Sequence, residues 1–273
     1  MEKEKVALIR EQETLMVPLY SRALETRKAS PIIEDRKALE IVDSIDYDFS
    51  KLEIPKQTHV TICMRAKYFD DFTRTFLNEN PRSLFIHLGC GLDSRFERID
   101  NGSVEWYDLD YAEVMKLRKK FYSEKTRYNM IESSAINISW LDKVDNSDNK
   151  PVVILAEGLL MYLPEEEIKK LFQALQSKFG HCLIIFDCYS LLTASNINRH
   201  PSFQKTGAVV YWGIDEAEEI EEWGENIHLL DEWYFSKSSE IDKLDFFYRL
   251  LFKMAGASKI AQKAHRIITL ELG

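Results

Sequence analysis

The stretch that decides the fold is FIHLGCGLDSRFERI, Phe85 to Ile99. Its first residues form an apolar run typical of a buried strand, and Gly89-Cys90-Gly91 then supplies a glycine turn. A dinucleotide fingerprint would place a third glycine three residues after the second, but here Asp93 and Arg95 follow instead. A carboxylate near a helix start disfavours a bound phosphate. The stretch therefore predicts a strand and a ligand-binding turn whose ligand is not a dinucleotide.

Short apolar runs alternate with helical patterns after this stretch. Such alternation is typical of a parallel sheet with helices on both faces, and near-continuous apolar runs suit strands that are buried on both sides. The predicted strands cover residues 83–90, 104–110, 128–136, 151–158 and 181–190, with helices at 111–124 and 164–179. Two later runs, at 231–236 and 264–272, predict strands at one edge of the sheet, with a helix at 242–256 between them.

The first third of the chain is helical in pattern. We expect a helix at 13–28 interrupted by Pro18, a second helix that begins at Pro31, and a third over 58–80 that stops before Pro81. The predicted organisation is a single compact unit with two parts. These are an N-terminal helical segment that helps to build the substrate site, residues 1–80, and an α/β domain, residues 81–273. An insertion at 191–230, after the fifth strand, is expected to form a cap.

Composition limits the classes of partner. The net charge of −9 argues against nucleic acid or an anionic membrane as the main partner, and 45% hydrophobic content fits a globular protein. The N-terminus lacks the apolar segment of a signal peptide, and no run approaches the roughly 20 apolar residues of a membrane span. Four dispersed cysteines indicate neither disulfides nor a metal site. We therefore expect a cytoplasmic protein without a metal; the sequence carries no signal for an oligomeric state.

Polar residues close nearly every predicted strand. Ligands of open α/β sheets bind beyond the carboxyl ends of the strands, so these residues define the candidate site. Asp110 ends the second strand about 20 residues after the glycines, where a carboxylate can bind both ribose hydroxyls. Asp108 points to the same side of that strand, so one of the two is expected to bind ribose and the other to be structural. Asp187, at the end of the fifth strand, is equally consistent with a helix N-cap.

The acid at Asp93 favours a ligand with an amino group and a sulfonium over one with a pyrophosphate. S-adenosylmethionine has both groups, and its carboxylate requires a cation. Arg65, in the helix before the first strand, is a candidate for that cation, although an arginine at such a position is commonly only solvated. A nicotinamide-dependent Rossmann oxidoreductase is the competing interpretation, and Asp93 together with the missing third glycine argues against it.

A series of motifs in the same order resembles one family. The segments are ETLMVPLYSRALE, ICMRAKYFDDF, IHLGCGLDSRFERID, VEWYDLDYAEVMKLR, SSAINISWLDKV, ILAEGLLMYLPEEE and LIIFDCYS. Together they resemble the class I S-adenosylmethionine-dependent O-methyltransferases of the leucine carboxyl methyltransferase family, in the branch named for the tetracenomycin polyketide O-methyltransferase. The likeness covers roughly residues 10 to 235. It implies a Rossmann-like, mostly parallel seven-stranded sheet with helices on both faces.

The resemblance implies a role for each matching residue at the cofactor. Arg65 is similar to the arginine that pairs with the methionyl carboxylate, and Glu157 to the acid nearest the methionyl amino group and the methyl. The other implied cofactor residues are Gly89 and Gly91 for backbone approach, Asp93 with Arg95 as support, Asp110 for the ribose, and Asn137 with Ile138 for the adenine. Asn137 stands where the family usually has an aspartate, so it keeps an acceptor oxygen but loses the charge.

The resemblance also implies an acceptor site. Tyr20 and Arg22 match the N-terminal segment that folds over the cofactor, and Tyr162 matches a tyrosine close to the methyl. The aromatic residues Phe203, Tyr211, Trp212 and Trp233 are candidates for the wall of an apolar acceptor pocket, although core packing is the commoner role for each of them taken singly.

The choice of acceptor depends on whether a base is present. A carboxylate is ionised at pH 7 and needs no base, whereas a phenol usually does. His87 fits a buried core histidine, and His200 is the histidine to test as a base, with Tyr162 as a second catalytic candidate. The predicted activity is therefore methyl transfer to a carboxylate or acidic hydroxyl of a small, polyketide-like molecule. A non-catalytic S-adenosylmethionine-binding protein is a further alternative.

Overall fold

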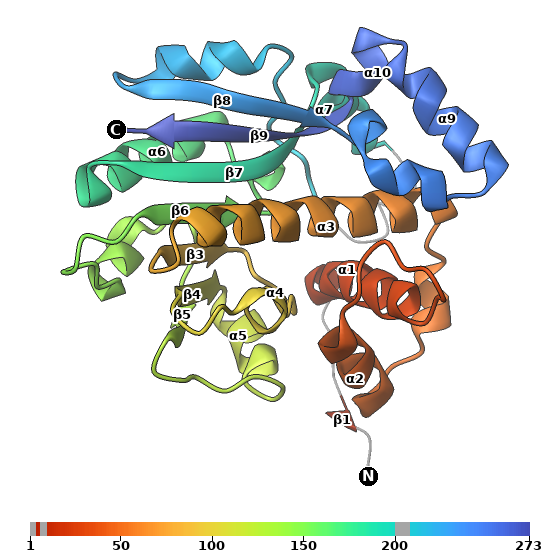
Figure 1. Cartoon of the computed structure of the whole chain (residues 1–273), viewed down its shortest axis with the longest axis horizontal. Coiled ribbons are helices and arrows are strands. Elements are labelled where there is room, and N and C mark those ends of the chain that lie inside the picture. Colours follow the sequence, from red (N-terminus) through yellow and green to blue (C-terminus); the bar gives the residue numbers. More distant parts are fainter. Residues whose placement is uncertain (1–3, 6–9, 200–207) are drawn as a thin grey trace.

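The computed structural model describes residues 4–5, 10–199 and 208–273 of the 273-residue chain. Its centre is a seven-stranded sheet in the order β5-β4-β3-β6-β7-β9-β8 (Figure 1). The first five strands in this order pair in parallel, whereas β9 runs antiparallel to both of its neighbours. The strands are β3 Leu84–Leu88, β4 Glu105–Asp110, β5 Tyr128–Glu132, β6 Val152–Ala156, β7 Cys182–Tyr189, β8 Ile227–Tyr234 and β9 His265–Leu272. A separate pair, β1 Glu4–Lys5 and β2 Ile45–Asp46, is also parallel.

Helices cover both faces of the sheet. Figure 1 shows α3 lying across one face, with α1 and α2 packed beyond it. The α-helices are α1 Arg10–Thr26, α2 Arg36–Ser44, α3 Lys56–Glu79, α4 Arg95–Ile99, α5 Ala112–Arg118, α6 Glu165–Phe179, α7 Leu191–Ile197, α9 Phe246–Gly256 and α10 Lys259–Lys263. Short 3-10 helices lie at Phe49–Leu52, Ile138–Lys143, Leu160–Tyr162, Ala217–Trp223, Phe235–Lys237 and Ser239–Lys243.

The alternating side chains of the strands feed two apolar cores. Ile86 and Leu88 of β3 point into the core beneath α6, which also holds Phe172. Phe85 points to the opposite face and packs with Trp106, whose ring is stacked on it at 5.3 Å. Alternate side chains of β3 are thus buried on opposite faces of the sheet, as expected for a central parallel strand. The predicted mostly parallel, seven-stranded sheet is confirmed.

Two predicted features of the N-terminal helices are wrong. Pro18 does not interrupt α1, because the helix continues on both sides of it and buries Met16 and Leu19 fully in the core. That burial compensates for the single backbone hydrogen bond that a proline removes. Pro31 does not start a helix either. Asp35 is the N-cap of α2 and accepts from the Ala38 N–H at 2.9 Å, which makes it the stronger start signal.

Two excursions from the sheet lie at the β8–β9 edge. The insertion predicted at 191–230 ends at residue 226, because β8 already begins at Ile227. It contains α7 and a 3-10 helix, where the sequence predicted an acidic helix, while residues 200–207 lie outside the described residues. The second excursion, 235–264, connects β8 to β9 and carries α9 and α10. The sequence predicted a helix at 242–256, which corresponds to α9, and gave no signal for α10.

Candidate functional site

The turn after β3 depends on glycine at two positions. Gly89 has φ +64° and Gly91 has φ +52°, a region that residues with a Cβ adopt at a cost. A Cβ on Gly89 would also lie 3.0 Å from a methyl carbon of Leu159. The Gly91 N–H donates to Asp110 Oδ2 at 2.8 Å, and the Tyr111 N–H donates to Oδ1 at 2.8 Å. The turn and the end of β4 are therefore held together by one carboxylate.

The structure separates the two aspartates of β4. Asp108 is fully enclosed and accepts from the Trp106 indole N–H at 2.8 Å, from the Tyr128 hydroxyl and from the Arg118 guanidinium. Asp110 accepts only backbone N–H groups, and burial raises its pKa against the effect of those bonds. Each of its oxygens keeps a lone pair for a further donor. Asp108 is thus structural, and Asp110 is the acid that can serve a ligand.

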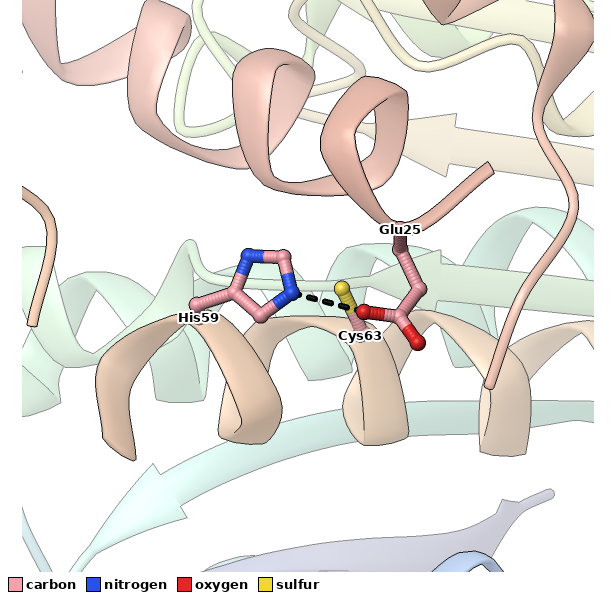
Figure 2. A group of neighbouring side chains, drawn as sticks. All are labelled: Glu25, His59 and Cys63. Atoms are coloured by element: carbon pink, nitrogen blue, oxygen red, sulfur yellow. Dashed lines mark hydrogen bonds and ion pairs between the residues drawn. The ribbon is translucent and has the colours of Figure 1, made fainter. Parts of the chain in front are cut away.

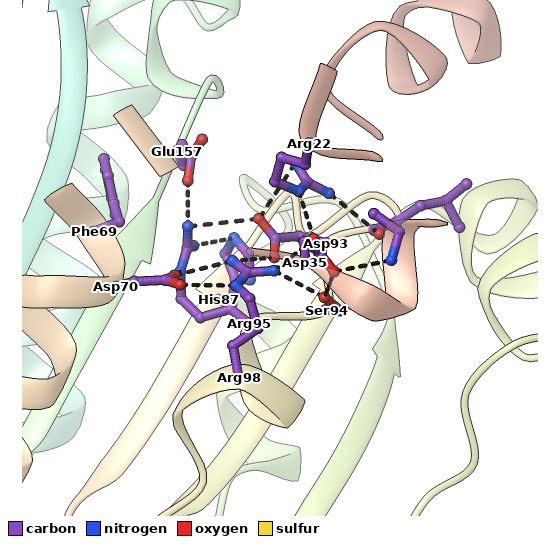
Figure 3. A network of polar contacts seen from close by, with 12 residues as sticks. Arg22, Asp35, Phe69, Asp70, His87, Asp93, Ser94, Arg95, Arg98 and Glu157 are labelled. Atoms are coloured by element: carbon purple, nitrogen blue, oxygen red, sulfur yellow. Dashed lines mark hydrogen bonds and ion pairs between the residues drawn. The ribbon is translucent and has the colours of Figure 1, made fainter. Parts of the chain in front are cut away.

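Asp93 lies among three guanidinium groups (Figure 3). Its carboxylate is 3.7 Å from Arg22, 3.5 Å from Arg95 and 3.0 Å from Arg98. Burial alone would raise the pKa of Asp93, but the three arginines hold it well below its ordinary value. The charge of Asp93 is therefore balanced within the protein. The hypothesis that this charge selects a sulfonium needs correction, because Asp93 organises the turn and does not present a free negative charge.

Arg95 braces the same region. Its side chain is fully buried, and it donates from Nε to Asp70 at 2.8 Å and from Nη2 to Glu157. Its guanidinium also lies over the ring of Phe69, 5.3 Å from the centroid. With every face of the group covered by protein, Arg95 supports the turn and holds Glu157 in place.

The predicted acceptor residues of α1 have other roles. Arg22 is buried and donates from Nε to Asp35 at 2.8 Å, so it ties α1 to the start of α2. Tyr20 stacks on Phe49 at 4.8 Å and packs against the core. Neither side chain lines the main cavity. The arginine–carboxylate network makes α1 part of the same rigid assembly as the turn.

Arg65 joins the ends of β6 and β7. It donates from Nε to Glu157 at 2.9 Å and from Nη1 to Asp187 at 2.7 Å, while Nη2 has no hydrogen bond to a described residue. A Cβ at Gly158 would lie 3.1 Å from Nη2, so the glycine makes room for the guanidinium. Asp187 does not cap a helix, because Ser190 is the N-cap of α7. Asp187 belongs to the site.

His265, at the start of β9, is a residue that the sequence analysis missed. Its Nε2 lies 2.8 Å from Asp187 Oδ2, and its ring packs between Tyr189 at 4.7 Å and Phe235 at 4.8 Å. Burial lowers the pKa of His265, although Asp187 acts in the opposite direction. Its Nδ1 has no hydrogen-bond partner among the described residues. The sequence did contain a signal for His265. A last strand that runs antiparallel to the others begins at the edge where the parallel strands end, and His265 there pairs with Tyr189.

A cavity of about 620 Å³ opens beside this pair. Its wall is mostly apolar, and the polar groups that reach it include Arg65, Tyr162 and His265. Burial raises the pKa of Tyr162, which keeps its hydroxyl neutral at pH 7. The other lining residues come mainly from α1, α3, α9 and α10: Val17, Pro18, Gln57, Thr58, Thr61, Ile62, Leu251, Phe252, Ala255, Ala261, Gln262 and Ala264, with Tyr189, Ile197, Ala208, Phe235 and Ser236.

The other predicted wall residues lie elsewhere. Trp212 is buried in the core, 6.0 Å from the ring of Phe186, and Trp233 stacks on Tyr68 at 4.3 Å. Tyr211 is 65% exposed and does not line the cavity. The remaining candidates of that part of the chain, His200 and Phe203, lie outside the described residues. His87 is a buried core histidine with contacts to Asp108 and Arg95.

Asn137 and Ile138 follow β5 and are separate from the cavity. Asn137 caps the following 3-10 helix, and its Oδ1 accepts from the Ser139 hydroxyl at 2.9 Å. Ile138 is half exposed, and both residues line a second hollow of about 500 Å³ that faces α6. Ile138 thus offers an uncovered apolar surface beside an amide, a combination suited to a planar heterocycle.

Glu25, His59 and Cys63 form a compact cluster between α1 and α3 (Figure 2). The Glu25 carboxylate is 2.6 Å from His59 Nε2, and it also accepts from Lys28 and from the Ile32 N–H at 2.9 Å. Burial raises the pKa of the Cys63 thiol, whereas a metal ligand must be a thiolate. With both Glu25 oxygens engaged and an ammonium adjacent, the cluster is a hydrogen-bonded clamp between two helices and does not suit a cation.

The fold and this site define a class of protein. The sheet has five parallel strands and an antiparallel strand next to its edge. A glycine turn follows the first strand of the α/β domain, and an acid closes the second strand. These features together define a class I S-adenosylmethionine-dependent methyltransferase. Residues 16–176 match the model of the leucine carboxyl methyltransferase family. The chain belongs to that family, and it is an S-adenosylmethionine-dependent enzyme.

Individual proteins support this assignment. The chain is 32% identical to the tetracenomycin polyketide synthesis O-methyltransferase TcmP of Streptomyces glaucescens over 84% of its own length and 85% of that protein. It is 27% identical to the S-adenosyl-L-methionine-dependent methyltransferase dpfgK of Gibberella zeae, over 81% of each chain. A DUF574 family protein from Streptomyces avermitilis shares the fold with a TM-score of 0.61 at 10% identity, over 97% of this chain and 100% of that one. No helix in the described part of the chain could cross a membrane.

Proposed function

We propose that this enzyme transfers the methyl group of S-adenosylmethionine to an acidic hydroxyl of a small, apolar, polyketide-like molecule. The observation that carries the proposal is His265, which is held by Asp187 and lies in the wall of an apolar cavity of about 620 Å³. A carboxylate acceptor would need no base, whereas a hydroxyl acceptor gains from one. The sequence offered His200 and Tyr162 as catalytic candidates and left both acceptors open, and His265 favours the hydroxyl.

Side chains at the strand ends fit the cofactor. We infer that the backbone of Gly89 and Gly91 lies against it and that the free lone pairs of Asp110 accept the ribose hydroxyls. The free Nη2 of Arg65 suits the methionyl carboxylate, and Glu157, anchored by Arg65 and Arg95, suits the amino group. For the adenine, the resemblance implies Asn137 and Ile138, which line a hollow that shares no lining residue with the acceptor cavity.

The mechanism assigns one task to each residue around the acceptor. The cofactor supplies an electrophilic methyl group on a sulfonium. We infer that Nδ1 of His265 accepts the proton of the acceptor hydroxyl, while Asp187 accepts from Nε2–H and fixes that tautomer. Arg65 lies against Asp187 and keeps it ionised, because it lowers the pKa of that carboxyl against the effect of burial. The apolar wall excludes water and aligns the acceptor, and alignment supplies much of the rate of a displacement.

The remaining parts of the proposal concern partner and compartment. An apolar cavity of about 620 Å³ suits a small molecule and not a nucleic acid. The four buried free cysteines support a reducing compartment, and we infer the cytoplasm.

Calorimetry with S-adenosylhomocysteine tests the cofactor site. We expect micromolar binding to the wild-type chain and loss of measurable binding in Asp110→Ala, because the ribose acceptor is removed. Asp148→Asn, a change at an exposed side chain, is the control and should bind as the wild type does. Tight binding of NADH instead would contradict the methyltransferase assignment for this chain, and unchanged binding in Asp110→Ala would mean that the cofactor lies elsewhere.

Methyl transfer to paired acceptors tests the substrate class. Radiolabelled S-adenosylmethionine is supplied with 2-naphthol or with 2-naphthoic acid, and the product is separated by chromatography. The expected product is the methyl ether of 2-naphthol. Exclusive formation of the methyl ester of 2-naphthoic acid would show that the acceptor is a carboxylate, and no transfer to either ring would contradict a small aromatic acceptor.

A further inference from the structure

The helices α9 and α10 present a continuous apolar stripe to solvent. In α9, Phe246, Leu250 and Met254 are spaced by four residues, and Phe247 with Leu251 forms a parallel row beside them. Leu251 lies at the edge of this face and also lines the cavity. The α10 helix adds Ile260, which is 72% exposed. Phe246 is 73% exposed and Met254 is 64% exposed. An exposed cluster of large apolar side chains on one element is a binding surface more often than a solvated face.

The charge of this segment is opposite to that of the chain. The whole chain carries −9, but residues 246–263 contain four basic residues and no acidic residue. Within the described residues Arg249, Lys253 and Lys259 form no salt bridge, whereas Lys263 pairs with Glu216 at 2.5 Å. A helix that combines exposed Phe and Leu with unpaired Lys and Arg is typical of elements that lie in a membrane interface. Whole-chain charge hides this feature, which is why composition predicted no membrane partner.

The opposite face of the same helices lines the acceptor cavity. Phe252 and Ala255 of α9 and Gln262 of α10 are among its lining residues. Figure 1 shows α9 and α10 at the periphery of the molecule, on the side opposite β3, β4 and β5. An apolar surface on which the outer face of α9 rests would therefore be separated from the cavity by one helix only.

We propose that the exposed face of α9 and α10 binds an anionic lipid surface. A second copy of the chain is the other occupant that such a stripe could take, but a two-fold contact would set the same basic segments against each other. An anionic bilayer offers both an apolar interior for the six side chains and negative headgroups for Arg249, Lys253 and Lys259. Long basic side chains can reach those headgroups while their stems stay in the apolar region.

Flotation with vesicles tests the proposal without any acceptor. The full chain is mixed with vesicles of phosphatidylcholine alone or of phosphatidylcholine with about one third phosphatidylglycerol, and the bound fraction is measured at low and at high salt. We expect binding to the anionic vesicles that falls at least about tenfold at high salt, as screening requires. Equal binding to both vesicle types, or no binding to either, would overturn the proposal.

Matched variants locate the surface. Phe246→Ser with Met254→Ser should reduce vesicle binding at least about tenfold, and Lys253→Glu with Lys259→Glu should reduce it by a similar factor. Leu230→Ser, at an exposed apolar residue of β8, and Lys51→Glu, at an exposed lysine distant in sequence, should bind as the wild type does. Circular dichroism and S-adenosylhomocysteine affinity check that each variant is folded. Sedimentation showing a dimer that Phe246→Ser with Met254→Ser dissociates, without vesicle binding, would assign the stripe to a second copy and refute the lipid surface.

Discussion

At the residue scale, the central feature of the proposed acceptor site is the fixed position of the His265 imidazole. His265 is oriented by Asp187, which is itself held by Arg65 and by the Gly158 N–H. Tyr189 and Phe235 pack against both sides of the ring, so it has little freedom to turn. An imidazole held in this way is oriented before any acceptor binds, and the lowered pKa of His265 keeps it unprotonated at pH 7.

Replacing this histidine should change the pH dependence of methyl transfer and leave the cofactor site intact. The wild-type rate with 2-naphthol should rise with pH in the acidic range and reach its plateau before pH 7, because His265, with its lowered pKa, is already neutral at pH 7. His265→Gln should be about 10²–10⁴-fold slower at pH 7 and should keep rising with pH as the acceptor itself ionises. The measurement is single-turnover methyl transfer from pH 5 to 9.

Two controls distinguish a base from a structural role. His181→Gln removes an exposed histidine that contacts Glu271 and should leave the profile unchanged. The S-adenosylhomocysteine affinity of His265→Gln should match that of the wild type within about twofold. A variant with the wild-type profile at all pH values would show that His265 takes no proton.

At the element scale, the turn after β3 is the part of the proposed cofactor site that depends on glycine. Gly89→Ala should destabilise the protein by about 1–2 kcal/mol through the left-handed backbone alone, and its Cβ would also press on Leu159. We expect S-adenosylhomocysteine affinity to fall more than tenfold, measured by calorimetry, because the turn must shift. Gly102→Ala is the matched control, since Gly102 has φ +80° but no atom within 4 Å of the added Cβ. It should lose stability without losing affinity.

The elements that the sequence predicted well are those with strong local patterns. The five parallel strands have apolar runs bounded by turn residues, and α3 and α6 have clear helical repeats, so their positions followed from periodicity. The continuation of α1 through Pro18 did not follow, because it depends on tertiary burial of Met16 and Leu19. The α10 helix is short, and no local pattern marks it.

Most residues of the candidate site that the sequence could propose lie at strand ends, and Arg65 of α3 was proposed from its place in a family motif. Asp110 and the glycines of the turn satisfy a local spacing rule, so the sequence alone could propose them. The partnership of His265 with Asp187 joins residues 78 positions apart through an antiparallel strand, and no spacing rule reports it. Trp212 was expected in the wall of the acceptor pocket because of its residue type, but its side chain is buried in the core. Residue type alone does not tell a core aromatic from a pocket aromatic.

At the scale of the whole molecule, buried ion pairs join the N-terminal helices to the sheet. Burial alone would raise the pKa values of Asp35, Asp70 and Asp93, but the surrounding arginines lower all three. Carboxyls with lowered pKa values in the folded state stabilise it at neutral pH and lose that contribution as acid protonates them. We therefore expect acid to weaken the attachment of α1, α2 and α3 to the α/β domain.

Glu25 offers a sharp test of the same acid dependence within the N-terminal helices, because its partners His59, Lys28 and Ile32 all lie there. Burial alone would raise its pKa, but hydrogen bonds from His59, Lys28 and the Ile32 N–H lower it from 4.5 to about 2. Its contribution to stability is therefore complete above about pH 4.5 and disappears as the pH falls towards 2. Glu25→Gln should lower the free energy of unfolding at pH 7 by about 1–3 kcal/mol, because it weakens a buried hydrogen-bond network.

Urea unfolding at pH 7, 5 and 3 provides the measurement. The difference between wild type and Glu25→Gln should be the same at pH 7 and pH 5 and should shrink at pH 3, because only the wild type has a carboxylate to protonate. Glu40→Gln, at an exposed residue that pairs with Lys37 at 2.8 Å, is the control and should change stability by less than about 1 kcal/mol at every pH. A difference in the free energy of unfolding between wild type and Glu25→Gln that is constant from pH 7 to 3 would contradict this prediction. It would show that packing, and not the charge of Glu25, stabilises the α1–α3 contact, so that this contact would not be sensitive to acid.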